Sequence, residues 1–228
     1  MDERLKEMAV TSTAHAVGVE VTGRGGEKAT AGSVDLPAIE QILAGWGETP
    51  QKVARRTIEK YGPPNEATPS RLIWFDNAPW KRTIVYRDEV PHNFPKPHTD
   101  LLEQFIDYRV PPERFSELAA YDGSVIAERT KGEISARCDK EEMNFLALNL
   151  AHDVATGRRN AEDARREYAE QATAFMLKRA APYTERLLFD IPHGGTADKD
   201  RPKPGPMVKE MMSGGDRMRP ESPGPAAP

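Results

Sequence analysis

The chain has 228 residues, of which 38% are hydrophobic and 30% charged, and its formal net charge is −4. This length suits one domain of ordinary size with additional tails. Because the charge is mildly acidic, we expect neither nucleic acid nor an anionic membrane as a partner. The single cysteine, Cys138, excludes an intramolecular disulfide and a zinc site built from several cysteines of one chain.

The two ends of the chain differ in composition from the middle. Residues 194–228 contain six glycines and seven prolines, and residues 1–35 hold a glycine-rich run without a sustained period. Such segments cannot bury enough apolar surface to offset the entropy lost on ordering them. We therefore predict disordered segments over residues 1–35 and 194–228 and a single domain over residues 36–193. No apolar stretch has the length of a signal peptide or a membrane helix, so we expect a cytoplasmic protein.

Two short helices are predicted at the start of the domain. In residues 35–47, Asp35 is placed to cap a helix whose apolar residues recur every three or four positions. In residues 49–62, Thr49 is the expected cap, and Pro50 takes the first helical position. A glycine follows each of these patterns and is a typical helix stop.

Three strands are predicted next. Residues 71–76 and 81–90 are rich in β-branched and aromatic side chains, and the Asn-Ala-Pro-Trp segment between them predicts a hairpin turn. Residues 101–110 alternate apolar and charged side chains towards their end, which favours a third strand.

The second half of the predicted domain contains both kinds of element. We expect a short helix over residues 111–122 and a hairpin over residues 124–138. The most regular helical pattern covers residues 139–156, with Asp139 as the expected cap. A last helix, capped by Asn160, carries an alanine-rich stripe that suits packing on a sheet or on a second copy of the chain.

The predicted order of elements is roughly ααβββαββαα. Because most strands are joined by short turns, the simplest arrangement is an antiparallel sheet of about five strands packed against helices. The fold class is therefore predicted to be α+β. The stripe on the last helix also suggests a homodimer through residues 160–180.

Residues 91–100, with the sequence PHNFPKPHTD, hold two histidines and an aspartate among three prolines. His92, His98 and Asp100 are competent ligands for zinc or iron, and His152 could add a further ligand. The prolines favour a different interpretation, an extended polyproline-like connection whose polar side chains face water. Two histidines six residues apart match no strong metal motif, so both interpretations stay open.

Two further features suggest sites. Cys138 precedes the predicted cap of the longest helix, where a helix dipole can lower the pKa of a thiol, so it is a candidate reactive thiol; an inert buried cysteine is the alternative. Trp80, Arg82 and Phe94 lie in or near the first hairpin, and aromatic side chains with cations can form a ligand or partner surface. This second interpretation requires Trp80, at the turn, to be exposed.

The sequence contains no phosphate-binding loop, dinucleotide fingerprint or nucleophile elbow. The favoured function is therefore a soluble binding or accessory protein with a protein partner, no cofactor and no catalytic activity. The alternative is a metal-dependent, hydrolase-like enzyme that holds a divalent metal, zinc or iron, with His92, His98 and Asp100, assisted by His152.

Overall fold

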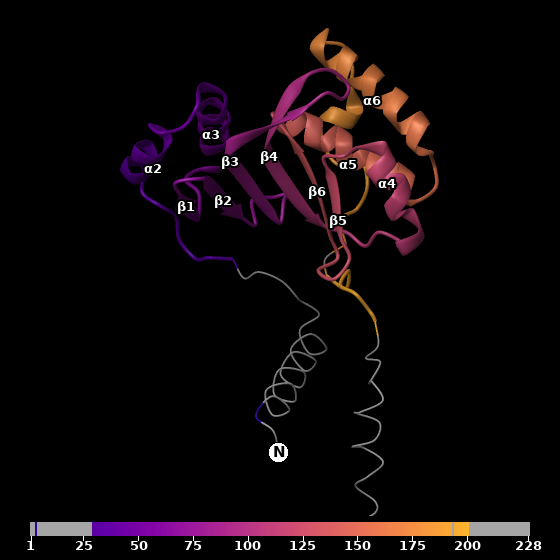
Figure 1. Ribbon diagram of the computed structural model, residues 1–228, viewed down its shortest axis with the longest axis horizontal. Coiled ribbons are helices and arrows are strands. Elements are labelled where there is room, and N and C mark those ends of the chain that lie inside the picture. Colours follow the sequence, from indigo (N-terminus) through magenta and orange to yellow (C-terminus); the bar gives the residue numbers. More distant parts are fainter. Residues whose placement is uncertain (1–2, 4–28, 193, 201–228) are drawn as a thin grey trace, which may run out of the picture. The chain divides into compact units, whose positions relative to one another are not determined.

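The computed structural model describes residue 3, residues 29–192 and residues 194–200. Within these residues, a six-stranded antiparallel sheet has the strand order β1-β2-β3-β4-β6-β5, and five α-helices accompany it (Figure 1). The predicted α+β class, with an antiparallel sheet against helices, is confirmed. No helix in the described ranges combines the length and apolar character that crossing a membrane would require.

The predicted helices and strands are present, and one short strand is added. The strands are β1 (Glu66–Thr68), β2 (Arg71–Phe75), β3 (Arg82–His92), β4 (His98–Asp107), β5 (Val125–Glu128) and β6 (Glu133–Cys138). The helices are α2 (Leu36–Leu43), α3 (Glu48–Tyr61), α4 (Phe115–Tyr121), α5 (Glu141–Ala155) and α6 (Ala161–Met176), with short 3-10 turns at Pro112–Arg114 and Pro182–Thr184. The added strand is β1, which pairs with β2 over three residues only.

Most of the two segments predicted to be disordered lies outside the described residues. At the inner edge of each segment, however, the backbone contacts the domain. Val34 donates a hydrogen bond to the Pro64 carbonyl at 2.8 Å, and Asp198 donates one to the Thr130 carbonyl at 3.3 Å. Backbone hydrogen bonds to the domain therefore occur on both sides of the predicted range of 36–193.

The helix caps follow the sequence signals in part. Asp35 and Asn160 cap α2 and α6 through their side chains, as predicted. The predicted cap of α3 is wrong, because this helix begins after Gly47 and includes Thr49 in its first turn. Pro50 is tolerated there, since the first N–H groups of a helix have no intrahelical acceptor.

Alternation along the strands places both apolar clusters on one face of the sheet. Leu72, Trp74 and Val85 pack with side chains of α2 and α3, while Ile106 and Ile134 pack with α5 and α6. Twelve of the fifteen residues of α5 are buried, which confirms the prediction that it belongs to the core. Its cap is Lys140, one residue later than predicted.

Candidate metal centre

Residues 91–100 form the end of a hairpin. β3 runs to His92, β4 begins at His98, and these two residues are paired across the strands. Asp100 lies two residues beyond His98 and therefore on the same face. The predicted polyproline connection is wrong, because Pro95 and Pro97 fall in the turn and remove no hydrogen bond from the strand ladder.

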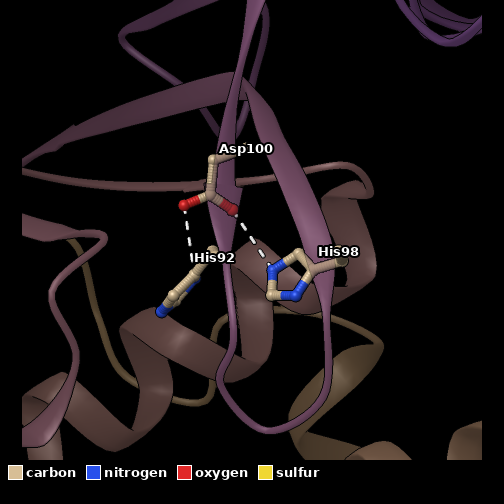
Figure 2. A group of neighbouring side chains, drawn as sticks. All are labelled: His92, His98 and Asp100. Atoms are coloured by element: carbon tan, nitrogen blue, oxygen red, sulfur yellow. Dashed lines mark ion pairs between the residues drawn. The ribbon is translucent and has the colours of Figure 1, made fainter.

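The side chains of His92, His98 and Asp100 converge on one another (Figure 2). His92 Nδ1 lies 3.2 Å from Asp100 Oδ2, and His98 Nε2 lies 3.2 Å from Asp100 Oδ1. One ligand atom from each residue can be chosen so that all three lie within 4.8 Å of one another. Ligands bound tetrahedrally to zinc at about 2.0–2.2 Å are roughly 3.3–3.6 Å apart. The two 3.2 Å contacts are close to this spacing, whereas the 4.8 Å limit for the whole group is wider, so the side chains would have to move closer together around a single ion. No other such group occurs among the described residues.

A hydrogen bond identifies which ring nitrogen of His98 carries the proton. The other nitrogen, which faces the carboxylate of Asp100, has none in the neutral ring. His98 Nδ1 lies 2.8 Å from the carbonyl oxygen of Lys96, which can only accept, so Nδ1 carries a proton. In the neutral ring, Nε2 is then an acceptor, and it lies 3.2 Å from Asp100 Oδ1. Two acceptors this close require a proton or a cation between them. A backbone carbonyl behind the non-ligating nitrogen is also the usual support of a metal-bound histidine.

Two ligand atoms of the group lack hydrogen bonds. Asp100 Oδ1 and His92 Nδ1 are both buried and have no hydrogen-bond partner among the described residues. Their 3.2 Å contacts have the distance of an ion pair but not the direction of a hydrogen bond. Asp100 is only 3% exposed, and an unsatisfied buried carboxylate oxygen is costly. A cation bound between the three side chains would remove this cost.

Without a metal, a proton can occupy part of this space. The carboxylate of Asp100, with a smaller effect from Cys138 and against the effect of burial, raises the pKa of His98 to about 11. His98 is then an imidazolium beside Asp100. A metal would have to displace this proton, as it does at any histidine ligand.

Asp122, at the end of α4, supports the group from behind and was not singled out by the sequence analysis. Its Oδ1 lies 3.8 Å from His92 Nε2 and accepts hydrogen bonds from the backbone N and the Oγ of Ser124, each at 2.8 Å. Burial raises the pKa of Asp122 against the effect of these hydrogen bonds. A carboxylate behind an imidazole orients the ring and increases its basicity towards a metal. In the sequence, Asp122 was visible only as part of a helix stop.

His152 does not join the group. Its ring stacks on Phe189 with the centroids 4.2 Å apart, and its Nδ1 lies 2.8 Å from the hydroxyl of Tyr108. Burial lowers the pKa of His152, as expected for an imidazole among aromatic rings. The sequence-based assignment of His152 as a further ligand is not met, because α5 directs it into a different part of the core.

Cys138 lies beside His98 but outside the converging group. It is the last residue of β6 and is 4% exposed, and its sulfur lies 3.6 Å from Asp139 Oδ1. Burial raises the pKa of the Cys138 thiol, and the opposing effect of His98 does not offset it. The direction of this shift is opposite to the lowered pKa on which the reactive-thiol hypothesis rests.

Trp80, Arg82 and Phe94 do not form a common surface. Trp80 is 1% exposed, and its ring stacks on Phe145 with the centroids 4.8 Å apart, so the prediction of an exposed Trp80 is wrong. Arg82 is buried beside Glu133, which lies on the other face of the sheet. Phe94 packs against α6. The predicted ligand or partner surface is excluded by these separate environments.

Comparison with protein-family models, with curated proteins and with solved structures gave no match. The geometry of the His92, His98 and Asp100 group is therefore the basis for a functional proposal.

Proposed function

We propose that the protein binds one divalent transition metal ion, zinc or iron(II), through His92, His98 and Asp100, and acts as a metal-dependent enzyme of the hydrolase type. The observation that carries this proposal is the presence of two buried ligand atoms without a hydrogen-bond partner among the described residues, Asp100 Oδ1 and His92 Nδ1, in one converging group. Two imidazoles and a carboxylate are a ligand set that suits both metals.

The number of ligands favours a catalytic centre. Structural zinc sites are closed by four protein side chains, whereas catalytic sites combine three with an open position. The group has three members in the described chain, and neither Cys138 nor His152 belongs to it. When bound in such a site, a metal ion polarises a substrate oxygen or lowers the pKa of bound water to near neutrality. His92 and His98 would be held for this role by Asp122 and by the Lys96 carbonyl.

The competing function is the metal-free binding or accessory protein expected from the sequence. It is supported by the two imidazole–carboxylate contacts of 3.2 Å, which are also compatible with ion pairs that stabilise the hairpin. In that case the group would be structural, and a protein partner would remain to be found.

Elemental analysis by plasma mass spectrometry tests the proposal. Untagged protein is purified without chelators, and a second sample is stripped and reloaded with zinc. We expect close to one metal ion per chain, and we expect a His92→Ala, His98→Ala double variant to lose it. His152→Ala is the matched control, because it removes a partly buried histidine outside the group and should retain the metal. A wild-type chain that holds no metal after reloading would reject the proposal and favour the accessory function.

A homodimer through residues 160–180 remains a proposal. α6 buries Ala164, Tyr168 and Ala172 within its own domain, so the alanine stripe is already used. The apolar side chains left for a dimer contact are Met176 and Leu177, which are 48% and 56% exposed. Light scattering should show a dimer that Met176→Glu dissociates; a wild-type monomer at all concentrations would reject it.

A further inference from the structure

A pocket of about 590 Å³ opens beside the candidate metal centre. It is lined by the tip of the β3–β4 hairpin, the start of α5 and the second half of α6, and Figure 1 shows the hairpin bending over towards α6. Its volume is in the range of small-molecule sites. Of the three candidate ligands, His98 lines this pocket, so the pocket and the centre share this one side chain.

The wall of the pocket that the helices supply is largely apolar. Met143 of α5 and Phe175 of α6 lie on it, and Ala169 and Ala172, one turn apart on α6, leave space beside them. Two prolines of the hairpin turn line the other side. Such a wall stabilises a ligand in proportion to the apolar area that it removes from water.

Lys96 adds a positive charge that no carboxylate neutralises. Its Nζ lies 2.8 Å from Met176 Sδ, and no acidic partner pairs with it in the described part of the chain. Of the two acids of the lining, Asp139 pairs with a neighbouring lysine, whereas Glu89 accepts a hydrogen bond from a threonine hydroxyl and keeps its charge. A divalent ion near His98 would be offset by Asp100 and, behind His92, by Asp122. An anionic head group would pair with Lys96 and could take the open coordination position of the ion.

We infer that this pocket binds a small carboxylate with an apolar chain. The head group would lie towards His98 and Lys96, and the chain would follow α6 past Ala169 and Ala172. This inference rests on the proposed function, because the head group is to be bound by the metal ion. It names the ligand class of that same centre.

Alkyl hydroxamates are suitable probes, because a hydroxamate chelates zinc as a carboxylate analogue while its chain length is varied. Octanohydroxamate and acetohydroxamate are titrated by calorimetry into zinc-loaded protein. We expect the octanoyl compound to bind at least about tenfold more tightly. Lys96→Met should weaken both compounds about threefold.

Variants of α6 test where the chain lies. Ala169→Trp fills the pocket from an exposed position and should remove most of the chain-length advantage. Thr173→Trp, also exposed and on the pocket wall, is the second variant if the first does not fold. Glu170→Trp is the matched control, because Glu170 is exposed on the same helix but does not line the pocket.

The outcomes separate the two proposals. Equal affinity of zinc-loaded protein for both hydroxamates would overturn this inference and leave the metal centre intact. An unchanged chain-length advantage in a folded, zinc-loaded Ala169→Trp or Thr173→Trp variant would also overturn it. A protein that holds no zinc would refute the proposed function and this inference together.

Discussion

Glu141 and Asp100 are both largely buried carboxylates on the helix-covered side of the sheet, yet their surroundings differ. Glu141, at the start of α5, accepts hydrogen bonds from the side chains of Lys60, Tyr61, Trp80 and Gln104. Asp100 faces two imidazole nitrogens at 3.2 Å, but its Oδ1 accepts no hydrogen bond among the described residues. Glu141 therefore connects α3, β4 and α5 and stabilises the fold. The difference indicates that burial of a carboxylate does not by itself identify a metal site. The better indication is a buried carboxylate oxygen that accepts no hydrogen bond and lies close to other potential ligands.

The largest effect is expected from Asp100→Asn. The amide keeps the shape of the side chain but loses its charge, so we expect metal affinity to fall at least about 100-fold. This loss should exceed the loss caused by substituting a residue that only orients a ligand. Competition with a chromophoric chelator measures this, and circular dichroism checks that the fold is kept. A variant that binds zinc within threefold of the wild type would contradict the role given to Asp100.

Glu141→Gln should have the opposite profile. Four donors, one of them a lysine ammonium, would face a neutral amide, and we expect the free energy of unfolding to fall by about 2 kcal/mol. Urea unfolding monitored by fluorescence gives this value. Metal affinity should not change. If this variant lost zinc as strongly as Asp100→Asn, the division between a structural and a metal-binding carboxylate would be refuted.

Asp122→Asn sharpens the comparison, because Asp122 is a third buried carboxylate that lies behind His92. We expect a loss of about tenfold in metal affinity, the usual effect of a residue that orients a ligand. The same chelator competition measures it. Unchanged affinity would show that Asp122 serves only its hydrogen bonds with Ser124.

The smallest effect is the pH dependence that Glu141 contributes. Burial disfavours its ionised form, but hydrogen bonds from Lys60, Tyr61, Trp80 and Gln104 outweigh burial and lower its pKa below 4.5. Its contribution to stability is therefore complete above pH 4.5 and is lost as the pH falls through the lowered pKa. The stability difference between wild type and Glu141→Gln should shrink between pH 5 and pH 3 in urea titrations. A difference that grows on acidification would contradict the direction of the shift.

Local signals in the sequence were sufficient for most of the fold. Alternating apolar residues identified the longer strands, and caps at Asp35 and Asn160 located two helix starts. The caps of α3 and α5 were misplaced by one or two residues, because prolines and acids are favourable at several positions of a first turn. β1 was missed because three residues are too few for a period to appear.

The site was harder to predict because its geometry depends on distant segments. The sequence named His92, His98 and Asp100, but three prolines concealed the hairpin that pairs the histidines. The register shift between Val85 and Val90 also interrupts the alternation from which their common face could have been inferred. Trp80 was expected at the surface, but α5, more than 60 residues later, covers it with Phe145. No local pattern contains that contact.

The most direct measurement is X-ray diffraction from crystals of zinc-loaded protein, with data collected on both sides of the zinc absorption edge. We expect one anomalous peak at about 2.0–2.2 Å from His92 Nδ1, His98 Nε2 and an oxygen of Asp100. We also expect His98 Nδ1 to remain hydrogen-bonded to the Lys96 carbonyl. A zinc-loaded crystal without a peak at this position, with the imidazoles hydrogen-bonded to Asp100, would contradict the central claim.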